Sequence, residues 1–330
     1  MQKIIFLGTD LHGKPSELAS KIARDMTKKA KNYTIVSIQN IKPISKENNK
    51  IIIPRFFKNE RLRKIFQGIL LPLFLIFLRT KHKKIFCIWT PSSRYHYYLF
   101  WLLKVLRYSL EFMVISGYDK NYEALKFCDR IICQSKRMKD YISSLFPEKE
   151  ITLVYPSVDF EIFKPKKKTY DILIPSVPYK IKDFEERGVD KIIKILKKGK
   201  FKTIIIFRSG ESYNYFKKLN LKNVKLINKI LDDKELAEIM SKAKVIPLIY
   251  EKNSPDMPLS AVEGLASGCA ILCTENIGLA EIIKKEKCGI VIKNSKNKEI
   301  WQVIEEILSN SIYNKNARKA AEKYFRGGKI

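Results

Sequence analysis

The stretch with the clearest chemical character runs from Ser254 to Glu281 and reads SPDMPLSAVEGLASGCAILCTENIGLAE. A proline-rich loop leads into a predicted helix over residues 260–267, and Gly268 follows as its C-cap. The first N–H groups of a helix have no partner within it, so they can bind a phosphate. Glu263 lies one turn into this helix, where its carboxylate could hydrogen-bond the vicinal hydroxyls of a ribose. The alternative is an ordinary helix glutamate exposed to solvent.

A second loop of interest, Gly8–Ser16, follows the first predicted strand and opens a helix. It is not a dinucleotide-binding fingerprint, because the spacing from Gly8 to Gly13 lacks the middle glycine of G-x-G-x-x-G. No Walker lysine pattern, D-x-D motif or C-x-x-C pair occurs in the sequence. The sequence therefore contains no motif that predicts a metal centre.

The helices and strands that would position these residues can be predicted from the sequence. Short apolar runs alternate with longer amphipathic ones, which is typical of α/β folds with parallel sheets. In the first half we predict strands over 4–8, 33–39, 84–89, 111–116, 130–134 and 151–155, with helices over 16–31, 94–108 and 135–145. In the second half we predict strands over 171–175, 201–207, 224–227, 245–248, 270–273 and 289–292, with helices over 189–197, 212–219, 233–241, 260–267, 279–286, 296–309 and 312–325.

Between the two series lies a polar, proline-bounded and lysine-rich stretch over residues 156–168, which we interpret as a linker. The length of 330 residues also suits two domains, each large enough to bury a core. We expect two Rossmann-like, doubly wound domains facing a cleft, over 1–160 and 161–310. A final helix over 311–330 is expected to pack toward the first domain. Ligands of such sheets bind beyond the carboxyl ends of the strands.

The composition is that of a globular protein, with 45 % hydrophobic and 30 % charged residues. The net charge of +30 favours polyanionic partners such as phosphates, anionic lipid or nucleic acid. Residues 1–160 hold 29 basic and 13 acidic groups, so the excess is not confined to a tail. Nucleic-acid recognition motifs are absent, which makes charge the sole argument for that partner.

The six cysteines and the N-terminal residues indicate the cellular compartment in which the protein is expected. The cysteines show no metal-ligand spacing and are interpreted as buried thiols in a reducing cytoplasm. The apolar run at the N-terminus is too short for a signal peptide. We therefore expect a cytoplasmic protein.

One segment departs from the α/β pattern. Ile65–Leu78 is apolar throughout, apart from Gln67 and Gly68, and is flanked by seven basic residues with no acid among them: Arg61, Arg63, Lys64, Arg79, Lys81, Lys83 and Lys84. It is shorter than the roughly 20 residues that cross a bilayer. It is either a buried core helix kinked at Pro72 or a helix lying on an anionic membrane, on the inner face of the cell membrane.

Four segments between residues 111 and 325 resemble motifs of the group 1, or family 4, GT-B glycosyltransferases. After Glu263 come GLASGCAIL and, at Gly278–Ile283, GLAEII, similar to the family's E-A-x-A-x-G-x-P-V-V and G-x-x-E-I-I. Val154–Pro165, VYPSVDFEIFKP, is similar to the family's P-N-G-V-D-x-x-x-F-x-P. The two other similar segments are Cys128–Ile142 and Leu231–Val245.

The resemblance implies transfer of a hexose-type sugar, with retention and without metal or other cofactor, from a nucleoside diphosphate sugar, UDP- or GDP-linked. The acceptor would be a lipid-linked molecule, a glycan or a protein. It implies that Glu263 binds the ribose, Leu259 and Ser260 the phosphates, Ile230 the base and Arg187 the diphosphate. Further donor-side candidates are Lys180, Lys182 and Arg208. On the acceptor side, Asp10, His12 and Gly13 lie in a loop of the kind that lines the cleft of GT-B proteins.

Three positions depart from the family pattern. The first acid of the family's pair falls on Pro255, with Asp256 one place later. The arginine of G-R-L is replaced around Val177, and the usual His-Asp reads Tyr118-Asp119. Asp256, Tyr118 and Asp119 are the resulting catalytic candidates. The departures also motivate a rival hypothesis, a catalytically degenerate GT-B protein that acts as a binding or scaffold subunit. A nucleotide-sugar epimerase and a nucleic-acid-binding protein are the remaining alternatives.

Overall fold

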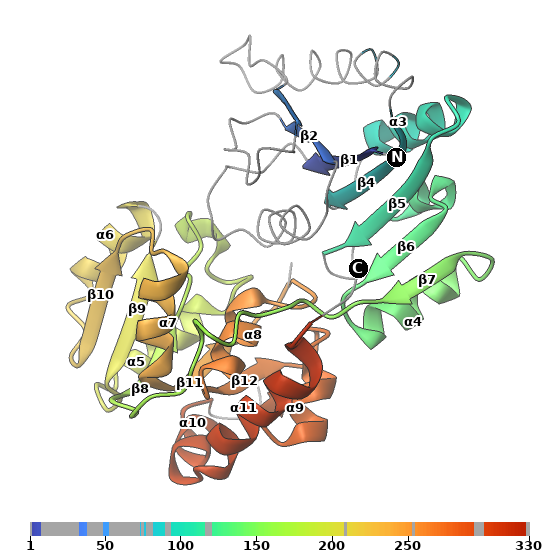
Figure 1. Ribbon diagram of the computed structural model, residues 1–330. Helices are drawn as coiled ribbons and strands as arrows, with labels where there is room; N and C mark the ends of the chain where they lie inside the picture. Colours follow the sequence, from blue (N-terminus) through green and yellow to red (C-terminus); the bar gives the residue numbers. More distant parts are fainter. Residues whose placement is uncertain are drawn as a thin grey trace. The chain divides into compact units, whose positions relative to one another are not determined.

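The computed structural model describes residues 2–7, 33–37, 49–52, 73, 76, 82–89, 94–115, 121–207, 210–252, 255–293 and 300–327. The chain divides into two compact units, Met1–Val154 together with Ile330, and Tyr155–Lys329. The boundary falls beside the predicted linker. Both units are built on parallel sheets, so the predicted α/β class with two Rossmann-like halves is confirmed (Figure 1).

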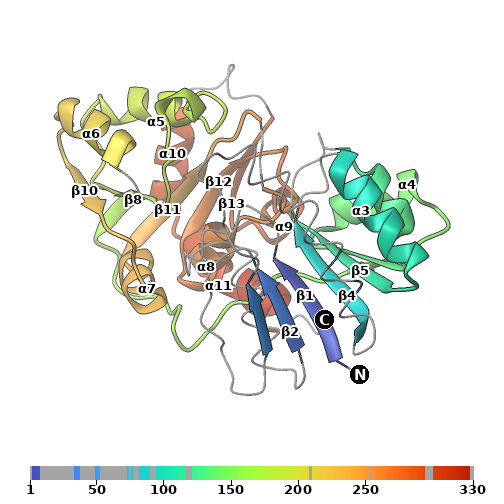
Figure 2. The same cartoon turned by 90° about the horizontal axis from the view of Figure 1, so that it is seen from above.

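In the first unit, seven described strands form a parallel sheet in the order β3-β2-β1-β4-β5-β6-β7. Figure 2 shows part of this order, β2-β1-β4-β5. Apolar side chains of β4, β5 and β6 form one core with side chains of α3 and α4. Ser135 caps α4 by accepting a hydrogen bond from Met138 N at 3.0 Å. The strands are β1 (Gln2–Leu7), β2 (Tyr33–Ser37), β3 (Asn49–Ile52), β4 (His82–Trp89), β5 (Ser109–Val114), β6 (Arg130–Cys133) and β7 (Glu150–Leu153), and the helices are α3 (Arg94–Val105), η1 (Glu123–Phe127) and α4 (Lys136–Leu145).

The second unit has six described strands in the order β10-β9-β8-β11-β12-β13, all parallel. Alternate residues of its strands face two cores: Ile204 joins one, and Ile205 the other. The strands are β8 (Tyr170–Ile174), β9 (Thr203–Phe207), β10 (Val224–Asn228), β11 (Ala243–Leu248), β12 (Ala270–Thr274) and β13 (Gly289–Ile292). The helices are η2 (Ile181–Asp183), α5 (Val189–Leu196), α6 (Gly210–Lys218), α7 (Asp233–Ser241), α8 (Leu259–Ala266), α9 (Ala280–Glu286), α10 (Ile300–Ser309) and α11 (Ile312–Phe325).

Helices cover both faces of this second sheet. Residues of α7, α8, α9 and α11 contribute to one core, and residues of α5, α6 and α10 to the other. From β8 the chain continues through β9 and β10 toward one edge of the sheet. From β11 it continues through β12 and β13 toward the opposite edge. Strands β8 and β11 therefore flank the topological switch point, the place where open α/β sheets bind ligands.

Two cations hold the carboxyl end of α8. Arg318 Nη1 donates to the carbonyl oxygens of Ala266 and Phe163, both at 2.8 Å, and Lys168 Nζ donates to the Ser267 carbonyl at 2.8 Å. Burial lowers the pKa of Lys168. Cations at this end of a helix satisfy its last carbonyl groups and complement the helix dipole. These bonds hold the carboxyl end of α8 in place and thereby fix the position of the N-terminus at the opposite end of the helix.

The C-terminal helix α11 packs against α8 and α9 of its own unit (Figure 1). Its small residues Ala317, Ala320 and Ala321 are buried, which lets the helix approach α8 closely, and Phe325 closes the core. The expectation that residues 311–330 pack toward the first unit stays a prediction.

The six cysteines are free and buried, as the sequence indicated. Burial raises the pKa of Cys273 and of Cys128 well above the range of an exposed thiol. These side chains therefore behave as small apolar groups, three in the core of the first unit and three in one core of the second.

Two parts of the sequence prediction fall largely outside the residues with a described structure. The helix predicted over 16–31 is one. Of the apolar run Ile65–Leu78, Leu73 and Ile76 are described, and their side chains are 57 % and 47 % exposed. Within the described part of the chain, no helix is long and apolar enough to cross a bilayer.

We predict that Arg318→Ala lowers the free energy of unfolding by about 2–4 kcal/mol, because the Ala266 carbonyl at the end of α8 and the Phe163 carbonyl both lose a charged donor. Arg318→Lys keeps the charge but loses the planar fork, so it should give an intermediate loss. Urea denaturation followed by circular dichroism measures both.

The matched control is Arg326→Ala, which removes a 66 % exposed arginine of the same region. It should change stability by no more than about 0.5 kcal/mol. Equal effects of the two alanine variants would contradict the role given to Arg318.

Candidate functional site

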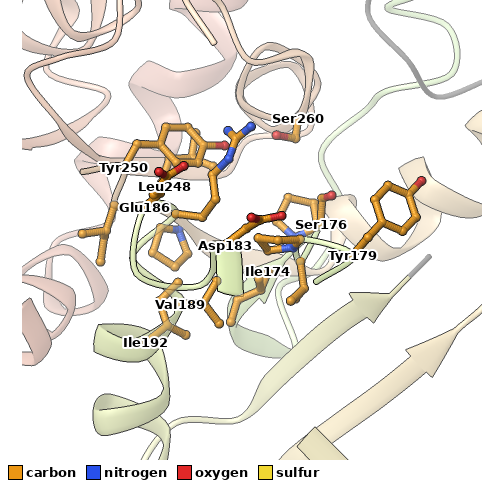
Figure 3. A pocket seen from close by; sticks show the side chains of 16 residues that line it. Ile174, Ser176, Tyr179, Asp183, Glu186, Val189, Ile192, Leu248, Tyr250 and Ser260 are labelled. Carbon is orange, nitrogen blue, oxygen red and sulfur yellow. The ribbon is translucent and has the colours of Figure 1, made fainter. Parts of the chain in front are cut away.

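A pocket of about 450 Å³ opens at the carboxyl ends of β8 and β11 (Figure 3). Tyr250 and Ser260 approach it from one side, and Asp183 and Ser176 from the other. Its position is the switch point of the second sheet. The remaining lining residues are Ile174, Pro175, Val177, Pro178, Tyr179, Glu186, Arg187, Val189, Ile192, Pro247, Leu248 and Ile249.

The turn that carries Arg187 is held against the end of β11. Gly188 has a φ of +62°, and a Cβ at this position would lie 1.9 Å from the carbonyl oxygen of Ile249. Only glycine permits both this backbone conformation and this approach. The carbonyl of Glu186 accepts hydrogen bonds from Glu251 N at 2.9 Å and Lys252 N at 3.1 Å. An ion pair between Lys191 and Glu251 adds a third tie.

Arg187 is in turn positioned by Tyr250. The guanidinium carbon lies 5.1 Å from the centre of the Tyr250 ring, within the range of a cation–π contact. Burial raises the pKa of Tyr250, and the charge and hydrogen bond of Arg187 partly offset the rise. Since Tyr250 stays neutral near pH 7, it orients the cation without cancelling its charge.

The backbone of Tyr250 is itself anchored to the loop after β12. Its carbonyl oxygen accepts hydrogen bonds from Thr274 Oγ1 at 2.9 Å and from Asn276 Nδ2 at 2.8 Å. Thr274 Oγ1 and Asn276 Oδ1 are 2.6 Å apart, which closes the network. The cation of the pocket is thus fixed by a chain of contacts that reaches across β11 to β12.

Helix α8 brings its N-terminus to the pocket. Pro258 is the N-cap and makes no side-chain cap, and Ser260, in the first turn, lines the pocket. The unbonded N–H groups of a first helical turn and the positive end of the helix dipole both favour an anion. Arg187 and the start of α8 together give the pocket two sources of positive potential.

Glu263 lies in the same helix and is 5 % exposed. It is therefore not the solvent-exposed helix glutamate that was the alternative at the level of sequence. Asp256, in the loop before α8, is also fully buried, and its carbonyl oxygen accepts a hydrogen bond from Gly278 N at 2.8 Å. This bond joins the loop before α8 to the loop before α9.

The other sequence candidates are distributed as follows. Lys180 and Lys182 are exposed at η2 and do not line the pocket, and Ile230 is 45 % exposed after β10. Val177, which takes the place of the family's arginine, is 4 % exposed and belongs to the apolar core. Candidates that lie outside the described residues are Asp10, His12, Gly13, Tyr118, Asp119 and Arg208.

Sequence reasoning missed Tyr250, Thr274 and Asn276. The available signal was position: each follows the end of a predicted strand, where side chains of a parallel sheet meet ligands. Their mutual contacts gave no signal, because nothing in the spacing of Arg187 and Tyr250 indicates that they touch.

Comparison with known proteins finds one family model that matches the segment carrying this geometry. Residues 161–324 match the family model described as "Glycosyl transferases group 1". The fold is that of the GT-B glycosyltransferases, and the chain resembles group 1 of them. The matched segment contains the pocket, Arg187, Tyr250 and the whole of α8.

Among solved structures, sucrose-phosphate synthase from Thermosynechococcus elongatus has a TM-score of 0.75 at 13 % identity, with 98 % of this chain and 95 % of that chain covered. Anabaena HepE in complex with UDP has a TM-score of 0.71 at 11 % identity, with coverage of 98 % and 96 %. An uncharacterized glycosyltransferase of Methanocaldococcus jannaschii is 26 % identical over 188 residues, which are 55 % of this chain. The match spans 50 % of that relative's length.

We predict that Gly188→Ala destabilises the second unit by about 2–4 kcal/mol, since alanine is strained at this φ and its Cβ would overlap the Ile249 carbonyl. Thermal or urea denaturation measures the loss. Gly210→Ala is the control, because a Cβ there meets nothing within 4 Å. A stable Gly188→Ala protein would mean that the Arg187 turn is not held as described.

Proposed function

We propose that the chain is a glycosyltransferase that binds a nucleoside diphosphate sugar in the pocket of its second unit. The observation that carries the proposal is the joint presence of Arg187 and the N-terminus of α8 at the switch point, within the segment that matches the family model. A diphosphate needs such preorganised positive groups both when it binds and when it leaves.

The donor is oriented by groups on both sides of the pocket. The diphosphate lies against the first N–H groups of α8, at Leu259 and Ser260, and Arg187 neutralises part of its charge. Glu263 accepts hydrogen bonds from the ribose hydroxyls, and backbone groups near Ile230 contact the base. The proposal also includes three further groups of residues. They are the catalytic candidates Asp256, Tyr118 and Asp119, the donor-side candidates Lys180, Lys182 and Arg208, and the acceptor-side candidates Asp10, His12 and Gly13.

Uridine diphosphate is the first choice of donor nucleotide, with guanosine diphosphate second. The support is that a similar fold, Anabaena HepE, was solved with UDP and with UDP-glucose. Retention of the sugar's configuration and independence of metal rest on the resemblance to group 1 enzymes. A hexose transferred to a lipid-linked molecule, a glycan or a protein is the corresponding reaction.

Transfer depends on how the bond to the leaving diphosphate breaks. Negative charge develops on the diphosphate as the sugar departs, and stabilisation of that charge lowers the barrier. Arg187 is held by Tyr250 and the Gly188 turn before substrate arrives, so little reorganisation is needed during reaction. The acceptor hydroxyl attacks the sugar as the bond to the diphosphate breaks, and its proton passes to the leaving diphosphate as the new glycosidic bond forms.

A second candidate function is a degenerate GT-B protein that binds without transferring. The observation that favours it is Val177: an apolar core residue stands where the family has an arginine, and Pro255 stands where it has an acid. Incubation with UDP-glucose or GDP-mannose and an assay for released nucleoside diphosphate separates the two. Binding without release or transfer over many hours supports the degenerate protein.

The decisive binding test is isothermal calorimetry with UDP, after a thermal-shift comparison of UDP, GDP and ADP. A nucleotide at about 100 times its dissociation constant should stabilise the chain by about 2.7 kcal/mol. Glu263→Gln should weaken binding by about 1.5–3 kcal/mol for each ribose hydrogen bond lost, while the amide keeps the shape of the side chain.

Glu306→Gln is the matched control, because Glu306 is an exposed glutamate of α10. Its nucleotide affinity should equal that of the wild type. If Glu263→Gln also binds with unchanged affinity, Glu263 does not contact the ribose. If no nucleotide binds the wild-type chain, the proposed function is wrong.

Transfer, once detected with a suitable acceptor, should persist in EDTA, because the proposed stabilisation of the leaving group comes from Arg187 and α8. The measurement is the initial rate before and after chelation, with and without added Mn²⁺. A strict requirement for Mn²⁺ would contradict this mechanism.

A further inference from the structure

Helix α3 of the first unit carries an apolar stripe that faces solvent. Tyr98, Trp101 and Val105 are 64 %, 51 % and 58 % exposed. Their spacing of three and four residues puts them on one side of the helix. The opposite side, with Leu99 and Leu103, is buried against the sheet. We call the three exposed residues the α3 stripe.

The residue types of the α3 stripe suit a lipid interface. Tryptophan and tyrosine are enriched where a bilayer meets water, since each has an apolar ring and a polar group. Contact between water and several neighbouring apolar side chains as exposed as these is unfavourable. An exposed apolar stripe of this kind marks an interaction surface.

The charge around the α3 stripe has one sign over a long stretch of sequence. Residues 61–110 contain ten lysines and arginines and no aspartate or glutamate. At the chain's average content of acids, 34 in 330 residues, about five would be expected here. The stretch begins just after Glu60 and ends just before Glu111, and it contains the whole of α3.

Basic groups also lie directly beside the helix. Arg107 is exposed just after α3, and Lys126 Nζ lies 4.6 Å from the centre of the Tyr97 ring. Lys104 is paired with Asp129 at 2.6 Å, which neutralises that neighbouring acid. Exposed Glu123 is the nearby acid on η1, the short helix packed against α3.

The same acid-free stretch contains a second exposed apolar pair. Leu73 and Ile76, three residues apart in the run Ile65–Leu78, are 57 % and 47 % exposed. Of the ten large apolar residues that are exposed in the described part of the chain, five lie between residues 61 and 110. Exposed apolar groups and one-signed charge therefore coincide in the sequence.

We propose that the α3 stripe docks on the surface of an anionic lipid bilayer, with Arg107 and Lys126, the described basic residues beside it, near the headgroups. Apolar side chains that enter the interface and cations that face anionic lipid act together in such binding. Charge selects this occupant. A second copy of the chain would bring the same basic surface against itself, which costs electrostatic energy.

This docking goes beyond the proposed function and does not depend on nucleotide binding. It would bring the first unit to a membrane, where an acceptor anchored in lipid is concentrated. A soluble acceptor gives no reason for an exposed stripe of this composition.

The test is flotation of the full chain with two kinds of vesicle, phosphatidylcholine alone and phosphatidylcholine mixed with phosphatidylglycerol. The wild type should float with the mixed vesicles and stay behind with the neutral ones. The variant Tyr98→Ser, Trp101→Ser, Val105→Ser should bind the mixed vesicles at least about tenfold more weakly, since it keeps every charge and loses the apolar contact.

Two matched variants separate the stripe from general surface changes. Leu145→Ser on α4 and Ile312→Ser on α11 each replace a side chain that is 45 % exposed. Both should float like the wild type. Thermal unfolding with and without UDP, run on the triple variant, establishes that the fold and the second unit are intact and tests nucleotide binding independently.

Some results would overturn the proposal. One is flotation of the triple variant equal to that of the wild type, and another is a wild type that binds neither vesicle. A wild-type dimer that the triple variant loses, seen by light scattering without lipid, would assign the stripe to a second copy of the chain instead.

Discussion

The parallel pairing of β8 with β11 is the constraint on which the candidate site depends. Tyr170 pairs with Ala243 and Ile172 with Val245, which joins the first and fourth strands of the second unit at the centre of the sheet. Because the chain leaves these two strands toward opposite edges, their following loops diverge and leave a pocket between them. The remaining contacts decide what chemistry that pocket holds.

Two sets of those contacts fix the positive groups of the pocket. Gly188 allows the Arg187 turn to lie against the Ile249 carbonyl, and Arg318 with Lys168 holds the far end of α8. The first fixes a cation and the second fixes a helix N-terminus. Both are set before any ligand binds, so the cost of ordering charged groups is met by folding and not by binding. The excess of basic residues over the whole chain adds a long-range attraction for anions.

The departures from the family pattern are local in the structure. Val177 belongs to an apolar core, so the loop after β8 contributes packing where the family has a charge. Arg187 belongs to the turn before α5, and its planar group can stack on Tyr250 in a way that a lysine ammonium cannot. The positive groups of the pocket thus come from the turn before α5, which carries Arg187, and from the N-terminus of α8.

By itself the sequence determined most of the fold. Apolar periodicity placed α7, β13 and α11 at their observed bounds, because these elements are amphipathic or wholly buried and end at clear turn signals. It missed β3, whose polar start, Asn49–Lys50, lacks the apolar alternation of a strand. It also pointed to Ser260, which lines the pocket, and to Glu263, whose contact with a ribose stays a prediction. Only the tertiary structure joined Arg187 to Tyr250, and Tyr250 to Thr274 and Asn276. Such pairings depend on which strands are neighbours in the sheet, and strand order leaves no periodic mark in the sequence.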